Sequence, residues 1–283
     1  MTDSCLVLEG GGLRCTFTGG ILEALLANQI IFPRLVGVSG GACSAVSYVS
    51  RQPGRNWKIH VELPSHPEFM GFRHLLAKGS YFNPGFTFEE IPSKLVPFDE
   101  NAYYSSSSKL EIVTTARATG THAVFGTNEQ ARLGINKVLL ASSSIPLLAP
   151  AVQLDDGFFF DGGVSDSIPV NYALEKSVKA VVVLTRPRGY RKKSPWSSYF
   201  YAWALRKYPN FLRAVVRRNE MYNTELDDCD RLEKEGRIFV FAPSAQIKVS
   251  RTEKSLKHRA AAYQHGQEIV TRELSRLQEF LGV

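Results

Sequence analysis

The chain has 283 residues, enough for one large domain or two small ones. Hydrophobic residues make up 44% and charged residues 22%, as in an ordinary globular protein, and no apolar run approaches the length that crosses a bilayer. The net charge is +7, and residues 186–218 alone hold ten lysines and arginines and no acid, which leaves −3 on the other 250 residues.

The N-terminal stretch MTDSCLVLEGGG has no basic region and only a strand-length apolar run, so we expect no signal peptide. The four cysteines, Cys5, Cys15, Cys43 and Cys229, show neither CxxC nor zinc-like spacing. They are typical of free thiols, three of them buried, in a reducing compartment. The sequence therefore predicts a cytoplasmic location and no metal site.

The predicted elements alternate between strands and helices. The first part of the chain predicts a strand at 5–8, a helix at 17–26, a strand at 35–38 and a helix at 42–49. After a polar, proline-rich region come a strand at 110–115, a hairpin partner at 122–125, a helix from Asn128 to about Ala141 and a strand at 158–160. Then follow a helix at 170–175, strands at 180–184 and 237–241, and a long helix opened by Thr252 and Ser255 and reaching Leu281. This alternation predicts a three-layer α/β/α sandwich around a mostly parallel sheet.

The motif GVSGG, residues 37–41, places Ser39 between an expected strand and an expected helix. Gly37 and Gly41 leave room for a sharp turn, and the helix N-terminus points its positive dipole end at the hydroxyl. A serine hydroxyl becomes a useful nucleophile only beside a base and an oxyanion site. Ser39 is therefore a candidate nucleophile, and the alternative is a glycine-rich turn that packs a helix on the sheet.

A second glycine motif, Glu9-Gly-Gly-Gly-Leu-Arg14, follows the first expected strand directly. Its main-chain N–H groups suit an oxyanion or a phosphate. A P-loop would need Gly-Lys-Ser/Thr where Leu13-Arg14-Cys15 stands. A dinucleotide fingerprint would need a glycine at Cys15 and an acid after the second strand, so both phosphate-binding alternatives are weakened.

No histidine has the position that a hydrolase base normally takes, on a loop late in the chain. The six histidines lie in the middle region, on a strand or within the terminal helix: His60, His66, His74, His122, His258 and His265. The motif Asp161-Gly-Gly163 instead follows the strand at 158–160, where a carboxylate could reach Ser39 across the sheet edge. Asp161 is thus the candidate base, Asp166 is its rival, and a turn aspartate bonded to its own backbone is the alternative.

Four blocks in this order resemble the patatin-like phospholipase family: 10–14 (GGGLR), 37–41 (GVSGG), 141–146 (ASSSIP) and 161–163 (DGG). The resemblance spans about residues 5–184 and implies a serine–aspartate dyad, without histidine, that acts on acyl esters of lipids. It implies Ser39 as the nucleophile and Asp161 as the proton acceptor. The N–H groups of Gly10, Gly11 and Gly12 would form the oxyanion hole.

The resemblance also implies that Arg14 holds an anion, with a structural salt bridge as the alternative. One departure is Cys15, where the family usually has glycine, which affects the expected path of the loop. We expect a catalytic domain at 1–245 and a C-terminal helical extension at 246–283 packed on it. No cofactor is implied. The predicted function is a phospholipase A or lysophospholipase type of esterase that works through an acyl-enzyme, and the alternatives are a soluble ester or thioester hydrolase and a catalytically silent lipid-binding scaffold.

The basic segment Arg186 to Arg218 interleaves its ten cations with eight aromatic residues. Such a pattern suits an anionic membrane surface, where tyrosine and tryptophan settle at the level of the head groups. A nucleic-acid partner is not expected, because no recognised binding motif accompanies the charge. The alternatives are peripheral contact with the inner membrane surface and ordinary packing of the aromatic rings with solvated cations around them.

Overall fold

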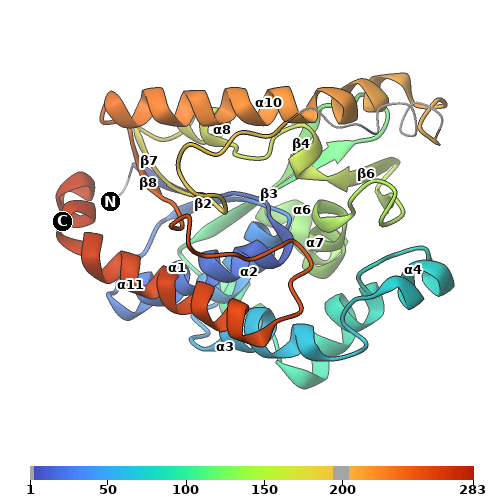
Figure 1. Cartoon of the computed structure of the whole chain (residues 1–283), viewed down its shortest axis with the longest axis horizontal. Coiled ribbons are helices and arrows are strands. Elements are labelled where there is room, and N and C mark those ends of the chain that lie inside the picture. The colour runs from blue at the N-terminus through green and yellow to red at the C-terminus, as the bar shows by residue number, and fades with distance from the viewer. Residues whose placement is uncertain (1–2, 194–203) are drawn as a thin grey trace.

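The computed structural model describes residues 3–193 and 204–283, and within them eight strands form one sheet at the centre of the molecule (Figure 1). The strands lie in the order β5-β6-β3-β2-β1-β7-β8, and β4 pairs with β3. Their bounds are β1 Ser4–Leu8, β2 Arg34–Val38, β3 Lys109–Ala116, β4 His122–Phe125, β5 Val152–Leu154, β6 Gly157–Asp161, β7 Lys179–Val183 and β8 Ile238–Phe241.

The strand register brings the ends of β2 and β6 together. β3, β2, β1, β7 and β8 run parallel, whereas β6 pairs antiparallel with β3. Val38 is the register partner of Val113, and Asp161 is the partner of Thr114. The last residues of both strands therefore lie beside the same point of β3, although more than 100 positions separate them in the chain.

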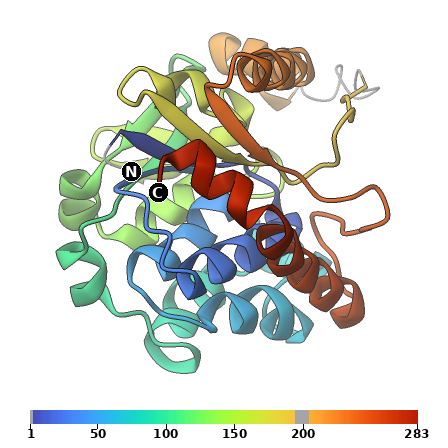
Figure 2. The same ribbon diagram turned by 90° about the vertical axis from the view of Figure 1, so that its left-hand side faces the viewer.

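Helices cover both faces of the sheet, as Figures 1 and 2 show, so the predicted three-layer α/β/α class is confirmed. Alternate side chains of β1 enter different cores: Leu6 and Leu8 join one cluster, and Cys5 and Val7 join the other. The first face carries α1 (Thr16–Ala27), α2 (Gly40–Val49), α7 (Ile135–Ser143) and α11 (Leu256–Leu281). The second carries α8 (Val170–Leu174) and α10 (Pro209–Lys234), which runs along the top of Figure 1.

One predicted helix is wrong in its start and in its continuity, and several elements were not predicted. The helix expected from Asn128 is two helices, α6 (Thr127–Leu133) and α7, and its N-cap is Gly126. Gly134 breaks it because its φ of 84° lies in the left-handed region that only glycine enters freely. The 26-residue α10 and the short β5 were not predicted.

The proline-rich middle region forms a series of short helical segments below α2 in Figure 1. Two of them, η2 and η4, are π-helices, an uncommon geometry that carries no simple hydrophobic period. The segments are α3 Arg55–Trp57, η2 Lys58–Glu62, η3 Leu63–Ser65, α4 Phe72–Lys78, η4 Phe86–Leu95 and α5 Glu100–Ser105.

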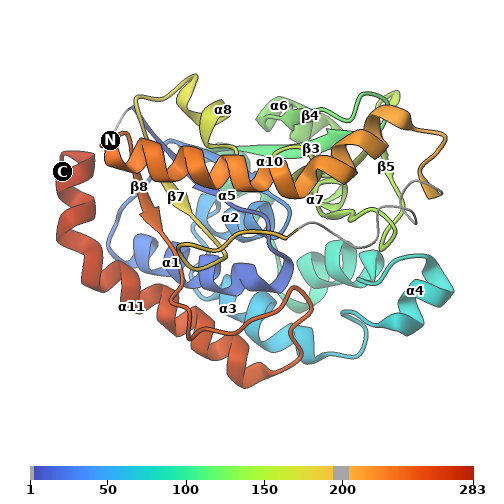
Figure 3. The same ribbon diagram turned by 45° about the horizontal axis from the view of Figure 1, so that its top comes forward.

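The C-terminal helix α11 begins where expected, with the Ser255 side chain accepting a hydrogen bond from the N–H of His258 at 3.3 Å. It lies along α1 at very short range, because ideal Cβ atoms on Gly20 and Gly266 would sit 1.9 Å and 2.4 Å from carbonyl oxygens of the facing helix. Figure 3 shows both chain ends at the same end of the molecule. None of the described helices is long and apolar enough to cross a membrane.

Candidate active site

Ser39 occupies a strained turn between β2 and α2. Its φ of 52° and ψ of −127° are values that non-glycine residues rarely adopt, and the residue directly follows the carboxyl end of β2. The turn depends on its neighbours, because a Cβ on Gly37 would lie 2.8 Å from Ala42 Cα, and one on Gly41 would lie 2.7 Å from the carbonyl oxygen of Leu8. These glycines account for the GVSGG motif physically.

A second serine fixes the backbone of this turn. The N–H of Ser39 donates to Ser142 Oγ at 2.8 Å, and Ser142 Oγ donates to the Val113 carbonyl at 2.7 Å. Ser142 lies near the C-terminal end of α7, in the ASSSIP block. In the sequence this block was recognised only through the family resemblance. The structure shows that its Ser142 accepts a hydrogen bond from the backbone of Ser39.

Asp161 ends β6 and is held from several sides. Its N–H donates to the Ser144 carbonyl at 2.9 Å, and its own carbonyl accepts from Thr115 Oγ1 at 2.9 Å. Carboxylate atom Oδ1 accepts from the N–H of Gly163 at 2.7 Å. The other oxygen, Oδ2, is left to face Ser39.

Ser39 and Asp161 are in direct contact. Ser39 Oγ donates to Asp161 Oδ2 at 2.8 Å, and both residues are only 5% exposed. No histidine among the described residues bonds to the Ser39 hydroxyl. His60 bonds Ser44 through Nε2 at 2.9 Å instead, and burial together with Arg55 lowers its pKa to about 4, so this ring is neutral.

The rival carboxylate Asp166 faces the other way. Its Oδ2 lies 3.8 Å from His122 Nδ1, and it also interacts with Glu225. Burial raises the pKa of Asp166 to about 6, while the charge of His122 acts in the opposite direction. Glu225 accepts from the N–H groups of Ser167 and Ile168, so this acidic pair supports the loop after Asp161.

The glycine loop lies against the turn that carries Ser39. The N–H of Gly10 already donates weakly to the Ser167 carbonyl, at 3.4 Å. The N–H groups of Gly11 and Gly12 have no acceptor among the described residues. Gly12 has a φ of 57° and lines the pocket beside Ser39, so Gly11 and Gly12 remain as the available donors.

Arg14 is buried, at 5% exposure, and does not line that pocket. Its Nε donates to Thr185 Oγ1 at 3.4 Å, and no carboxylate of the described residues forms an ion pair with it. Burial lowers the pKa of Arg14, with Arg251 acting in the same direction. The side chain therefore lies behind the glycine loop among other cations.

A pocket that is partly open to solvent extends from Ser39 over the α2 side of the sheet. Its walls are mostly apolar and come largely from the middle region and from the segment after α7. They include Leu13, Ile59, Phe69, Phe82, Phe88, Leu140, Ile145 and Leu148. Pockets of this kind, with one or two polar groups at the end, suit a ligand with a long apolar part.

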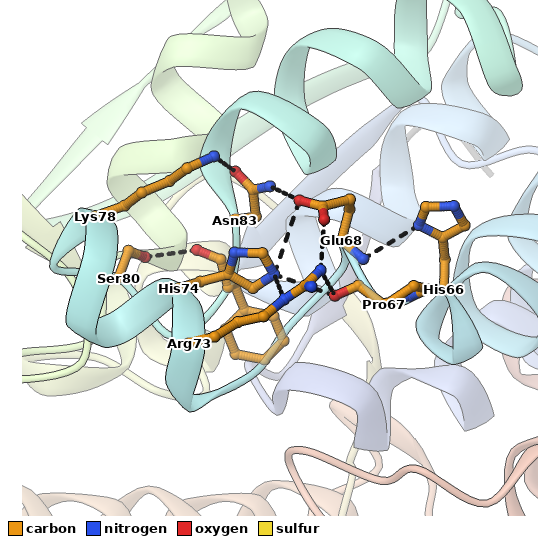
Figure 4. Close-up of polar contacts among 9 residues, drawn as sticks. His66, Pro67, Glu68, Arg73, His74, Lys78, Ser80 and Asn83 are labelled. Carbon is orange, nitrogen blue, oxygen red and sulfur yellow. Dashed lines mark hydrogen bonds and ion pairs between the residues drawn. The ribbon is translucent and has the colours of Figure 1, made fainter.

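The short helix α4 lies in the chain between two residues that line this pocket, Phe69 and Phe82. A polar network fixes it (Figure 4): His74 Nε2 lies 3.1 Å from the Pro67 carbonyl, and Asn83 donates to Glu68 at 3.1 Å. On the outer side Phe72 is 71% and Leu76 88% exposed. Two large apolar side chains of α4 are thus exposed to solvent.

The basic segment Arg186 to Arg218 divides into two groups of cations. Arg188 pairs with Glu233, and Arg191 pairs with Asp227 and Asp230, all of them acids on α10. By contrast, Arg218 turns inward and donates from Nε to the Gly163 carbonyl at 2.5 Å. Five of the eight aromatic residues, namely Trp196, Tyr199, Phe200, Tyr201 and Trp203, lie outside the described residues.

The model of one protein family, patatin-like phospholipase, matches residues 6–174, more than half of the chain. The chain therefore belongs to the patatin-like phospholipase family, and the resemblance predicted from the four blocks is confirmed. A second family model, a domain of unknown function (DUF6363), matches residues 208–282.

Two individual proteins are also similar to the chain. The uncharacterized protein YjjU of Escherichia coli K12 is 30% identical over 183 residues, which are 63% of this chain and 50% of that protein. The match thus spans about half the length of this curated relative. The crystal structure of VipD from Legionella pneumophila aligns with a TM-score of 0.46 and 13% identity, over 100% of this chain and 79% of that one.

Proposed function

We propose that the chain is a lipid acyl hydrolase that uses a Ser39–Asp161 dyad. The observation that carries the proposal is the 2.8 Å contact between the two side chains at the inner end of an apolar pocket. Membership of the patatin-like phospholipase family supports an acyl ester of a lipid as the substrate class.

In the proposed reaction, Ser39 Oγ attacks the ester carbonyl carbon while its proton passes to Asp161 Oδ2. The carbonyl oxygen becomes an oxyanion, which the N–H groups of Gly11 and Gly12 and the N-terminus of α2 stabilise. Collapse of this intermediate expels the alcohol, which takes the proton from Asp161. Water then attacks the acyl-serine and gives a proton to Asp161. Collapse of this second intermediate releases the acid, and Ser39 Oγ takes the proton back from Asp161.

A fluorophosphonate probe tests the nucleophile, because it labels only an activated serine. We expect stoichiometric labelling, located at Ser39 by mass spectrometry, and no labelling of the Ser39→Ala variant. Ser50→Ala, at the far end of α2, is the matched control and should label normally. A Ser39→Ala protein that still labels would refute the proposal, and an unlabelled wild type would favour the silent lipid-binding scaffold. Turnover of short water-soluble esters in preference to lipids would favour the soluble esterase.

We further propose that the rim of the pocket meets the lipid surface through α4, whose Phe72 and Leu76 would enter the head-group region. Replacing both with serine should weaken binding to phospholipid vesicles roughly tenfold or more, since each buried side chain of this size contributes about 1.5–3 kcal/mol. Vesicle co-sedimentation measures this.

Val178→Ser is the control for this experiment, because Val178 is 64% exposed and precedes β7 at the opposite edge of the sheet. Equal vesicle binding by the α4 double variant and the control would contradict the role of α4. If the basic segment 186–218 also contacts the membrane, binding to vesicles should weaken as the salt concentration rises and strengthen as the fraction of anionic lipid rises.

A further inference from the structure

Five basic residues that form no ion pair within the described part of the chain gather behind the glycine loop. We call them the inner basic cluster: Arg14, Arg186, Lys192, Arg218 and Arg251. Arg14 is buried, and the other four are half-buried. Among the described residues none of the five forms an ion pair, and residues 1–2 and 194–203 contain no aspartate or glutamate.

The cluster lies against both loops of the dyad. The Arg251 carbonyl accepts from the N–H of Leu13 at 3.0 Å, and Arg251 Cβ lies 3.4 Å from the position of a Cβ on Gly12. On the other loop, Arg218 Nη2 lies 3.4 Å from the position of a Cβ on Gly163, whose N–H bonds to Asp161. A group bound to these cations would therefore lie beside the reacting ester.

Lys192 completes this arrangement from the loop after β7. Its Nζ lies 3.4 Å above the ring of Tyr222, whose hydroxyl donates to Glu9 at 2.8 Å. Burial and then the charge of Arg218 lower the pKa of Lys192 to about 6, while the charge of Glu9 acts in the opposite direction. Lys192 is therefore largely neutral at pH 7, and an anion bound beside it would favour its charged form.

The contrast with neighbouring cations is informative. Arg188 and Arg191, which point outward, have carboxylate partners on α10, where the same helix offers several acids. Basic groups withdrawn from water carry a desolvation penalty, which the charge of the buried Glu9 offsets only in part, because it acts on Arg14, Lys192 and Arg251 without a direct ion pair. A protein that pairs its exposed arginines and leaves the inner ones unpaired has the charge distribution of an anion site.

We propose that the inner basic cluster binds the phosphate group of the substrate's head group while the acyl chain lies in the pocket on the other side of Ser39. This inference rests on the proposed function and extends it from the acyl chain to the head group. Arg186 and Lys192 lie beyond residues 6–174, and Arg218 and Arg251 belong to the 208–282 match. The proposal therefore gives residues 208–282, which match the domain of unknown function, a part in recognising the substrate.

A matched pair of substrates tests the site: dihexanoyl phosphatidylglycerol and dihexanoylglycerol, which share acyl chains and differ in the phosphate-bearing head group. The readout is kcat/KM for the phospholipid divided by kcat/KM for the neutral lipid. Arg251→Gln and Lys192→Met should each lower this ratio by about tenfold or more, as expected for the loss of a charged hydrogen bond. Arg188→Gln, which removes an outward, paired cation, is the control and should leave the ratio unchanged.

A second arm uses inorganic phosphate as the probe and calorimetric titration of the Ser39→Ala protein as the readout. If the variants lower the ratio of kcat/KM values, the ligand is a lipid head group. If they lose only the binding of inorganic phosphate, the ligand is free phosphate. Either result supports the site. Unchanged ratio and unchanged phosphate binding in both variants would overturn it. Failure of the proposed function looks different, because neither lipid would then be hydrolysed and Ser39 would not label.

Discussion

Replacing Asp161 with asparagine is expected to lower kcat/KM for ester hydrolysis by roughly 10²- to 10⁴-fold, the range for loss of a general base. An amide of the same shape can still accept the hydrogen bond from the N–H of Gly163, but it cannot take the proton of Ser39. The fold should persist, so circular dichroism and the thermal midpoint should stay close to those of the wild type while turnover is lost.

Asp166→Asn is the matched control, because Asp166 lies five positions away and is directed at His122 and Glu225. Its activity should remain near that of the wild type. The raised pKa of about 6 means that the folded state holds this proton more tightly than the unfolded chain does. The stability that it contributes is therefore present at low pH and lost as pH rises through about 6.

Asparagine resembles the protonated carboxyl, so the free energy of unfolding of Asp166→Asn should exceed that of the wild type above about pH 6. Denaturant titration at several pH values measures this difference. If Asp161→Asn remains active while Asp166→Asn is inactive, the two carboxylates have exchanged roles and the proposed dyad is wrong.

Gly266→Ala should destabilise the protein by at least about 2 kcal/mol, because the added methyl overpacks a rigid contact. The new Cβ would lie 2.4 Å from the Phe17 carbonyl oxygen and 2.9 Å from the Ile21 nitrogen, and neither backbone atom can move independently of α1. Helix propensity acts in the opposite direction and favours alanine by about 1 kcal/mol. Because the clash is the larger effect, the free energy of unfolding should fall.

Gln264→Ala lies on the exposed side of the same helix and provides the control, with unfolding close to that of the wild type. Urea denaturation of both variants gives the comparison. A Gly266→Ala protein as stable as the control would show that α11 does not pack on α1 at this distance. It would also weaken our proposal that residues 246–283 are an extension packed on the catalytic domain.

Much of the central sheet could be predicted because its strands are buried on both faces and read as short apolar runs. The expected strands at 5–8, 35–38 and 180–184 each begin one residue later than the observed strands, and only the third also ends one residue later. The missed α10 carried a usable signal, since Phe211, Val215, Tyr222, Leu226 and Cys229 recur at helical spacing. The unusual charge of the segment obscured that period.

The site was predictable only in part. Motif order singled out Ser39 and Asp161, two positions that the structure brings into contact. The apolar pocket was not predicted, because much of its wall comes from irregular segments without a sequence period. The inward turn of Arg218 was equally hidden, since composition records a charge and not the direction of its side chain.

One face of α10 contacts three chain segments near the dyad. Arg218 bonds to Gly163, Tyr222 bonds to Glu9, and Glu225 bonds to the backbone after Asp166. The helix thus works as a brace that sets the spacing of three chain segments from outside the family-matched residues 6–174. A protein trimmed to that match would keep its serine and its aspartate and lose the scaffold that aligns them.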